Sequence, residues 1–313
     1  MVVSNPVAFS IGPLAVRWYG ILIMLGVLAG ALLAARLARR KGVNPDYVWE
    51  MLPIVVFSAI AGARIYWVFL DWNTCCAQDP LQAFNIRGGG ISIQGALAAG
   101  ILSLWLYTRF KGVRFFRWVD ILAPAFALGQ AIGRWGNFTN QEAFGGPTSL
   151  PWGIYISPDR RPVGYEQYTH FHPTFLYESL ADLLTSLVLT WFVLRIDRDK
   201  RLRDGDGLWV YLMIYGVVRF FIEGMRTDSL YLGPFKAAQV ISVAAIALGL
   251  IGLGLRHIGW RGDDEEAEPA LAAAGAPAAG PEGDEAAEIN GAPRAAGPAR
   301  HERATEPTPP GTS

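Results

Sequence analysis

Long apolar runs separated by short polar segments make up most of the chain as far as about residue 260. Seven of these runs have the length, about 17 to 25 helical residues, that crossing about 30 Å of hydrocarbon requires. They lie near residues 16–37, 48–70, 90–108, 118–137, 174–194, 207–223 and 237–255. The pattern therefore predicts an all-α polytopic membrane protein with seven transmembrane helices.

Lysine and arginine are concentrated in alternate connections between the predicted spans. They follow the first, third, fifth and seventh spans, at Arg36, Arg39, Arg40, Lys41, Arg109, Lys111, Arg114, Arg117, Arg195, Arg198, Lys200, Arg201, Arg203, Arg256 and Arg261. Because cytoplasmic loops carry the excess of positive charge, this predicts an N-terminus outside and a cytoplasmic C-terminus. The residues before the first span include no Lys or Arg until Arg17, so we expect that span to be retained rather than cleaved.

The connections on the predicted outer side are the longer ones. Residues 138–173 are rich in Pro, Gly and aromatic residues, which predicts a small loop-rich head outside the membrane. The connection 71–87 contains Cys75 and Cys76, which we expect to be two ordinary thiols rather than a strained vicinal disulfide. We divide the chain into a seven-helix membrane domain, 1–261, and a tail, 262–313, whose Ala, Pro, Gly and Glu composition predicts disorder.

Charge is scarce and balanced in this sequence. Charged residues make up 17% of the chain against 52% hydrophobic residues, and the formal net charge is +0. No basic surface is available to attract nucleic acid, so we expect membrane lipids and not nucleic acid as partners. The chain also has no HExxH, GxSxG or zinc-ligand pattern, so we expect neither a metal nor an organic cofactor.

One stretch, QAIGRWGNFTNQEAFGG, places polar residues at the end of an apolar run. Its conspicuous residues are Arg134, Asn137, Asn140, Glu142 and Gly145. The arginine and the two asparagines recur every third residue, which would stack them along one flank of a helix. An ionisable side chain at bilayer depth is costly unless it is paired or placed in a cavity. We therefore hypothesise that this stretch binds an anionic lipid headgroup.

The predicted topology brings further polar residues to one level near the outer surface. They are Tyr19, Arg64, Gln94, Arg134, Tyr177, Glu178, Arg219 and Glu223. Arg219 and Glu223 are four residues apart on one helical face, so they either merely neutralise each other or belong to a site, and the pair alone favours neither. With Arg64 and Arg134 at the same height, we expect a cationic excess that binds phosphate, which suits the guanidinium fork.

Five stretches match motifs of a known family. They are FSIGPLAVRWYG at 9–20, GAR at 62–64, IGRWGNFTNQEAFG at 132–145, HPTFLYES at 172–179 and YGVVRFFIEGMR at 215–226. In these motifs the chain resembles the bacterial prolipoprotein diacylglyceryl transferases, seven-helix enzymes of the cytoplasmic (inner) membrane. The GR-x-GNF-x-N-x-E core is highly specific, and the resemblance covers most of the chain apart from the tail.

The resemblance implies a reaction. The diacylglyceryl group of phosphatidylglycerol passes to the thiol of the lipobox cysteine in a prolipoprotein signal peptide, so that a thioether forms and glycerol-1-phosphate leaves. It implies that Arg134 and Asn137 contact the lipid headgroup and that Arg219 is essential. We accordingly expect as catalytic residues Arg134, Arg219, Glu142 and Glu223, and as substrate-binding residues Arg134, Asn137, Asn140, Gly145, Tyr19 and Arg64.

One position departs from the family pattern. Many members carry a histidine in the third-span motif, HGGL or HGAL, that has been proposed as a base, whereas this chain reads ISIQGAL with Gln94 in that place. Glutamine cannot take up a proton near neutral pH. Either the histidine is not an obligatory base, or another group serves here, or the protein is impaired, and we favour the first. Glu142 or Glu223 would orient an arginine or act as the base, and the sequence leaves this open. For His172 we favour an ordered loop-to-helix junction over a base.

Two other functions fit intramembrane arginines. A transporter or flippase for an anionic lipid would also hold an anion, but it predicts polar residues through the full depth of the membrane or helices broken at the midplane. A non-catalytic scaffold that binds lipid is the second alternative. The bias of the polar residues toward the outer half of the spans favours the transferase.

Overall fold

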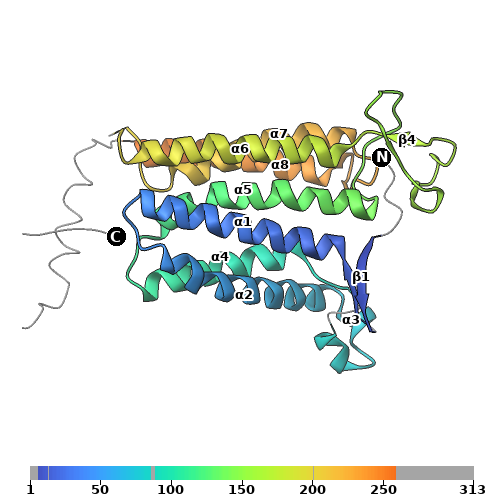
Figure 1. Ribbon diagram of the computed structural model, residues 1–313, viewed down its shortest axis with the longest axis horizontal. Coiled ribbons are helices and arrows are strands. Elements are labelled where there is room, and N and C mark those ends of the chain that lie inside the picture. Colours follow the sequence, from blue (N-terminus) through green and yellow to red (C-terminus); the bar gives the residue numbers. More distant parts are fainter. Residues whose placement is uncertain (1–5, 13, 86–88, 200, 259–313) are drawn as a thin grey trace, which may run out of the picture. The chain divides into compact units, whose positions relative to one another are not determined.

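The computed structural model describes residues 6–12, 14–85, 89–199 and 201–258 of the chain. Within them, seven helices of 18 residues or more lie side by side (Figure 1). They are α1 (Trp18–Arg40), α2 (Asp46–Leu70), α4 (Ile93–Phe110), α5 (Phe115–Asn140), α6 (Thr174–Ile196), α7 (Asp206–Met225) and α8 (Ala237–His257). The predicted tail, 262–313, lies outside the described residues.

Each predicted apolar run overlaps one of these helices. Among the described residues, six of the helices are long and apolar enough to cross a membrane, judged by length and composition. The third predicted span corresponds to α4, which has 18 residues and is not one of the six. The chain is thus a mostly helical protein with the character of a multi-pass membrane protein.

Glycines allow neighbouring helices to approach closely. A Cβ atom on Gly26 of α1 would lie 2.9 Å from the carbonyl oxygen of Gly129 on α5, and one on Gly30 would lie 2.8 Å from that of Ala125. In lipid the hydrophobic effect does not drive helices together, so their association depends on close van der Waals packing. Small residues are favoured at such contacts because they allow the backbones to approach closely. The same pairs show that α1 and α5 are antiparallel, because the residue number rises along α1 as it falls along α5.

The long helices pair unevenly. α1 packs mainly on α5, α2 mainly on α4, and α7 mainly on α8, while α6 contacts both α5 and α7. Contacts between α1 and α2 are sparse in comparison, and Figure 1 shows α2 and α4 together on one side of α1. The pair α2–α4 therefore forms a separate layer beside the helices that carry most of the predicted site.

The shorter elements follow the ends of the long helices. They are β1 (Val7–Ile11) with β2 (Leu14–Arg17), α3 (Trp72–Cys75), the 3₁₀ helices Pro80–Phe84 and Pro158–Arg160, β3 (Ile154–Tyr155) with β4 (His170–Phe171), and β5 (Tyr231–Leu232) with β6 (Phe235–Lys236). Figure 1 shows β1, α3 and β4 at the same end of the helices. The segment 138–173 packs on the start of α6 in a separate apolar cluster, formed by Phe144, Ile154, Ile156, Phe171 and Phe175.

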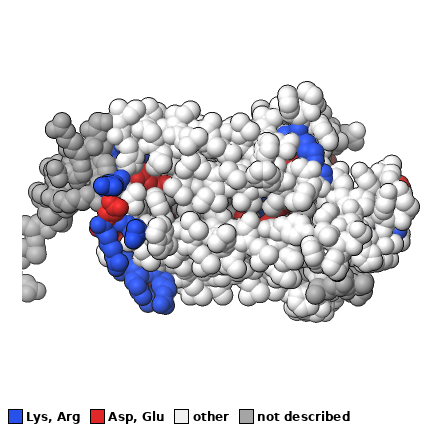
Figure 2. Space-filling model, turned by 90° about the horizontal axis from the view of Figure 1, so that it is seen from above, with Lys and Arg blue, Asp and Glu red and all other residues white. Residues whose placement is uncertain are grey.

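Lysine and arginine gather at the other end of the helices (Figure 2). Asp120, in the first two turns of α5, is fully buried. Its carboxylate accepts hydrogen bonds from the N–H groups of Gly205, at 2.6 Å, and Leu208, at 3.2 Å. The first N–H groups of a helix have no acceptor within the helix. The Asp120 carboxylate is the acceptor for two such groups at the start of α7. Its role is structural.

The two cysteines are joined to each other. Cys75 and Cys76 form a vicinal disulfide, and Cys76 is fully buried, so the expectation of two ordinary thiols was wrong. The N–H groups of Cys76 and Ala77 both donate to the carbonyl of Trp72, which closes a tight turn at the end of α3. This turn and the enclosure of Cys76 are features of tertiary packing that the spacing of two cysteines does not reveal.

We predict that Gly95→Ala separates α2 from α4 and destabilises the protein. The new methyl group would overlap the carbonyl oxygen of Gly62, and overpacking of this kind costs about 1–3 kcal/mol. Thermal unfolding in detergent should show a lower melting temperature. Gly254→Ala is the matched control, because nothing lies within 4 Å of its added Cβ. Equal melting temperatures for the two variants would contradict the close approach.

Candidate functional site

A shared carboxylate joins three helices near the end that carries β4. Glu178 on α6 lies between Arg134 of α5 and Arg219 of α7. Its Oε2 is 2.9 Å from Nη1 of Arg134, and its Oε1 accepts a hydrogen bond of 2.6 Å from Nη1 of Arg219. Glu178 is only 3% exposed, so both ion pairs are largely removed from solvent. Two arginines that lie 85 residues apart in the sequence are thereby held beside one group.

Two further carboxylates complete this cluster. Nη2 of Arg219 is 2.7 Å from Oε2 of Glu223, one turn further along α7. Nε of Arg134 is 3.7 Å from Oδ2 of Asp182, one turn beyond Glu178 on α6. Both carboxylates are buried. The pairing of Arg219 with Glu223 expected from their spacing is present, and it is part of a larger group.

The charge balance of the cluster differs from the expectation. Two guanidinium groups face three carboxylates, so the expected cationic excess was wrong for the residues in contact here. The expectation from the sequence included Arg64 and omitted Asp182. The sequence alone does not show which side chains are in contact. The positively charged side chains are nevertheless more exposed to solvent than the negatively charged ones. The side chains of Arg134 and Arg219 are 21% and 18% exposed, and those of the three carboxylates are 3–9% exposed. A ligand would therefore meet the arginines first.

The asparagines of the central motif hold a second acidic group. Nδ2 of Asn137 donates to Oε1 of Glu142 at 3.0 Å, and Nδ2 of Asn140 donates to the same oxygen at 3.3 Å. Glu142 can reach back to the helix because α5 ends at Asn140 and Gln141 adopts a left-handed conformation, with φ of 52°. Glu142 is exposed, unlike the carboxylates of the arginine cluster.

Tyr19 is near a member of each of these two groups. It stands at the start of α1, and its ring covers the backbone of α5 at Gly136, where an added Cβ would overlap the ring. Tyr19 is within electrostatic range of both Glu142 and Arg134. The phenol is partly exposed, so it borders the same surface as the arginines.

Gly145 joins the head to the end of α7. Its N–H donates to the carbonyl of His172 at 2.9 Å, and it forms an isolated β-bridge with Arg226. A Cβ at this position would lie 2.8 Å from the Cβ of His172, so no side chain fits. Arg226 pairs with Asp228 at 2.8 Å. Burial raises the pKa of the Asp228 carboxyl, but the hydrogen bonds and charge of Arg226 outweigh burial and lower it.

Arg64 is not among the residues brought together. It lies in α2, and its guanidinium donates to the carbonyl oxygens of Gln82, Ala83, Gly89 and Gly90. Within the described part of the chain these carbonyls take all of its hydrogen bonds, and none goes to the arginine cluster. Arg64 therefore fastens the segment after α3 to the start of α4, which explains an ionisable residue at this depth without a ligand.

Gln94 and His172 also lie apart from the ion pairs. The side-chain oxygen of Gln94 accepts a hydrogen bond from the hydroxyl of Ser92 at the start of α4. His172 stands where the head joins α6, with Nδ1 at 3.4 Å from the hydroxyl of Tyr177. The same hydroxyl accepts a hydrogen bond of 2.9 Å from the indole N–H of Trp152. This agrees with an ordered loop-to-helix junction at His172.

The sequence contained a signal for the residues that were missed. Glu178 was noted only for its depth, and Asp182 was not considered. They are four residues apart in an otherwise apolar run, a spacing that places two acidic side chains on one helical face. As regards metals, the described residues contain no group of three or more His, Cys, Asp or Glu side chains that could hold an ion.

Comparisons with known proteins point to one family. The family model described as "Prolipoprotein diacylglyceryl transferase" matches residues 6–255. A protein from Nostoc sp. is 47% identical over 255 residues, covering 81% of this chain and 90% of the relative. Similar proteins from Synechococcus elongatus and Chloroflexus aggregans are 46% and 43% identical, and the matches cover 80% and 78% of this chain and 86% of each relative. All three are named phosphatidylglycerol–prolipoprotein diacylglyceryl transferase.

We predict that Glu178→Gln destabilises the fold more than Glu223→Gln. The first substitution removes the charge that joins three helices, and breaking a buried ion pair costs about 3–5 kcal/mol. The second breaks a pair within α7 and leaves Arg219 bound to Glu178. Thermal unfolding of both variants in detergent provides the measurement. If Glu223→Gln melted at the same temperature as Glu178→Gln or below it, Glu178 would not be the group that holds these helices together.

Proposed function

Because the chain belongs to the prolipoprotein diacylglyceryl transferase family, we propose that Arg134 and Arg219 hold the phosphate of its lipid substrate during transfer. The chain is an enzyme that transfers the diacylglyceryl group of phosphatidylglycerol to prolipoproteins. The transporter alternative is not favoured by the names of its relatives. The observation that carries the proposal is the ion-paired Arg134–Glu178–Arg219 group, in which the two arginines are partly exposed beside a buried carboxylate.

The two arginines would act on the leaving group. The sulfur of a lipobox cysteine attacks the glyceryl carbon that bears the phosphate ester, the carbon–sulfur bond forms, and the carbon–oxygen electron pair leaves with glycerol-1-phosphate. Negative charge then grows on the phosphate oxygens. Two guanidinium groups fixed in advance can stabilise that charge without rearranging, which is where electrostatic catalysis is most effective. The forked geometry of the guanidinium also matches phosphate oxygens.

Glu178 has a positioning role in this proposal. The carboxylate oxygens of Glu178 are buried, so it is not placed to touch the substrate. By bonding Nη1 of each arginine it fixes both side chains. Nε of Arg134 and Nη2 of Arg219 face Asp182 and Glu223, so the nitrogens left for the ligand are Nη2 of Arg134 and Nε of Arg219. Glu223 would do the same for Arg219 alone. Of the two carboxylates that the sequence left as candidate bases, Glu223 is therefore the orienting group.

Glu142 is the carboxylate that we assign as the base. It is exposed, and its contacts with Asn137 and Asn140 are neutral amide hydrogen bonds rather than ion pairs. A cysteine thiol has a pKa near 8.5 and attacks as the thiolate, so a proton acceptor beside it speeds the reaction at neutral pH. The asparagines orient Glu142, and Tyr19 borders the space between it and Arg134. On this assignment a histidine in place of Gln94 is not needed.

The membrane arrangement completes the proposal. We place α4 across the membrane as the seventh span, beside α2. The end rich in Lys and Arg (Figure 2) lies in the cytoplasm, in keeping with the positive-inside rule. The arginine site, the head at 138–173 and the N-terminus then lie at the outer face of the inner membrane, where a prolipoprotein signal peptide presents its cysteine.

We predict that Arg134→Ala and Arg219→Ala each lower the transfer rate about 100-fold or more, since each removes a donor that stabilises the leaving phosphate. Purified enzyme is incubated with phosphatidylglycerol vesicles and a lipobox peptide, and the thioether product is measured per folded protein. Arg134→Lys should fall between wild type and Arg134→Ala, because it keeps the charge and loses the fork. Arg64→Ala is the control, and it should retain its rate per folded molecule. An active Arg134→Ala enzyme would rule out the clamp.

We further predict that Glu142→Gln loses about 100-fold in rate at neutral pH and recovers part of it as the pH approaches 9. The recovery is expected because the thiol then ionises without a base. Glu223→Gln, which affects the orientation of an arginine, should show no such recovery. Gln94→His should change the rate by less than about threefold at neutral pH. A pH profile of Glu142→Gln parallel to that of wild type would contradict the assignment.

A further inference from the structure

Several basic residues at the Lys- and Arg-rich end pair with carboxylates. Lys41 is 2.9 Å and Arg117 is 3.3 Å from Asp197, Lys111 is 2.6 Å from Glu50, and Arg256 is 3.6 Å from Asp206. The last two turns of α1 are different. Arg36 and Arg39 are exposed, and within the described part of the chain neither has a carboxylate or carbonyl partner.

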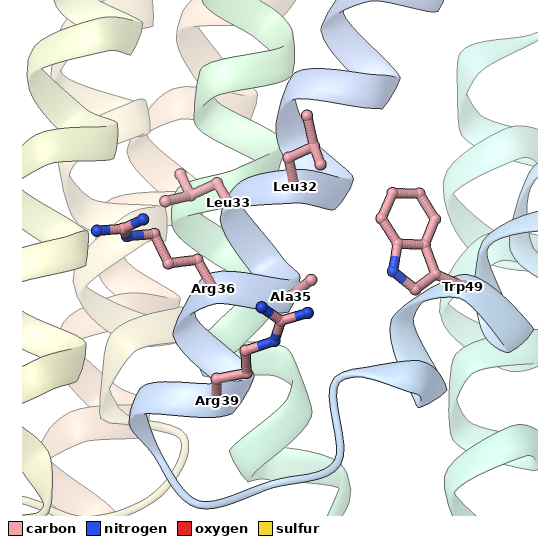
Figure 3. A pocket seen from close by; sticks show the side chains of 6 residues that line it. All are labelled: Leu32, Leu33, Ala35, Arg36, Arg39 and Trp49. Atoms are coloured by element: carbon pink, nitrogen blue, oxygen red, sulfur yellow. The ribbon is translucent and has the colours of Figure 1, made fainter. Parts of the chain in front are cut away.

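These two arginines line a cavity between α1 and α2. The cavity has a volume of about 370 Å³, and its walls are Leu32, Leu33, Ala35, Arg36, Arg39 and Trp49. In Figure 3 the guanidinium of Arg39 and the indole of Trp49 lie on the two sides of the gap between the helices. The guanidinium of Arg36 is directed away from Trp49. The gap exists because α1 packs on α5 while α2 packs on α4.

The cavity lies far from the Arg134–Arg219 site. The register of Gly26 against Gly129 and of Gly30 against Ala125 places Arg134 level with about residue 21 of α1. Arg39 follows that level by about 18 residues, which corresponds to roughly 27 Å at 1.5 Å per residue. One molecule of substrate headgroup cannot occupy both places. A ligand in the cavity would therefore be a different molecule from the one at the Arg134–Arg219 site.

The lining residues fit one kind of molecule. Arg39 and Arg36 provide unpaired positive charge at the ends of the spans, where lipid headgroups lie. Leu32 and Leu33, about one turn deeper on α1, provide apolar surface along which an acyl chain would run. Trp49 stands near the start of α2, the position where an indole bridges hydrocarbon and water. A soluble anion would leave the apolar walls unused, whereas an anionic lipid uses both halves.

We propose that the cavity between α1 and α2 binds the phosphodiester headgroup of an anionic phospholipid, with Arg39 as the main ligand and Arg36 as a second. The cavity volume lies within the range of small-molecule sites, about 300 to 1,000 Å³. The headgroup neutralises the two unpaired guanidinium groups and fills the gap that the helix pairing leaves between α1 and α2. This site is independent of the transfer reaction, since the residues assigned to that reaction lie at the other end.

The test measures lipid at Trp49. Full-length protein is reconstituted with dibrominated phosphatidylglycerol or dibrominated phosphatidylcholine, because bromine on an acyl chain quenches indole fluorescence at contact. The emission of Trp49 is the difference between wild type and Trp49→Phe. We expect stronger quenching of Trp49 by the anionic lipid. Arg39→Gln should weaken the apparent affinity about fivefold, the factor expected for one arginine near a lipid surface. Adding Arg36→Gln should weaken it further by less than that factor, because the guanidinium of Arg36 is directed away from Trp49.

Arg40→Gln is the matched control. Arg40 is exposed in the same turn of α1 and does not line the cavity, so this variant should keep the wild-type preference. All arginine variants should keep their transfer rate, which shows that they are folded. Equal quenching by the two lipids, or an equal loss in Arg40→Gln and Arg39→Gln, overturns the proposal. Displacement of the lipid by millimolar glycerol phosphate overturns it as well, because the site would then bind a soluble phosphate.

Discussion

The structure depends on the burial of one carboxylate between two guanidinium groups. Glu178 ties α6 to α5 through Arg134 and to α7 through Arg219, and the ion pairs are largely shielded from solvent. In a membrane protein an unpaired charge at this depth is costly, so the three helices are stable together mainly in arrangements that keep the three residues in contact. The same contact leaves parts of the arginines exposed, and this links the stability of the bundle to the geometry of its site.

Arg64 of α2 and Arg134 of α5 have different kinds of partner. Arg64 and Arg134 both lie in the second halves of their helices, yet Arg64 bonds to four backbone carbonyls in the connection between α2 and α4. Gln82 and Ala83 belong to the 3₁₀ helix Pro80–Phe84, and Gly89 and Gly90 precede α4, so Arg64 links two parts of this connection. Arg64 is therefore explained by the loop that it satisfies. Among the residues that the structure describes, the partners of Arg134 are the carboxylates of Glu178 and Asp182, and that difference distinguishes it from Arg64.

The acidic residues of the site divide according to exposure. Glu178, Asp182 and Glu223 are buried against arginines, while Glu142 is exposed and held by amide groups. A buried, ion-paired carboxylate is suited to holding a neighbour in place, and an exposed one is suited to exchanging a proton with a substrate. The cluster thus carries more negative than positive groups, and its arginines are nevertheless more exposed than its carboxylates.

Much of this protein could be read from its sequence. Apolar runs of membrane length fixed the long helices, because the thickness of the hydrocarbon sets the number of residues that a span requires. The motif from Arg134 to Gly145, with the other motifs, indicated the family, which the family model confirms. These features are local, so they are legible in the order of residues. The pairing of Arg219 with Glu223 is of the same kind, since it spans one helical turn.

Tertiary structure alone decided which distant side chains meet. The sequence predicted one common membrane depth for Arg64, Arg134, Arg219 and Glu178. A common depth does not specify the direction in which each side chain leaves its helix. The close approach of α1 to α5 and of α2 to α4 sets the directions in which the helices face. As a result, Arg64 contacts a loop and Glu178 contacts the two arginines. The disulfide of Cys75 and Cys76 was decided in the same way, because the packing around a side chain is not encoded in its spacing from its neighbours.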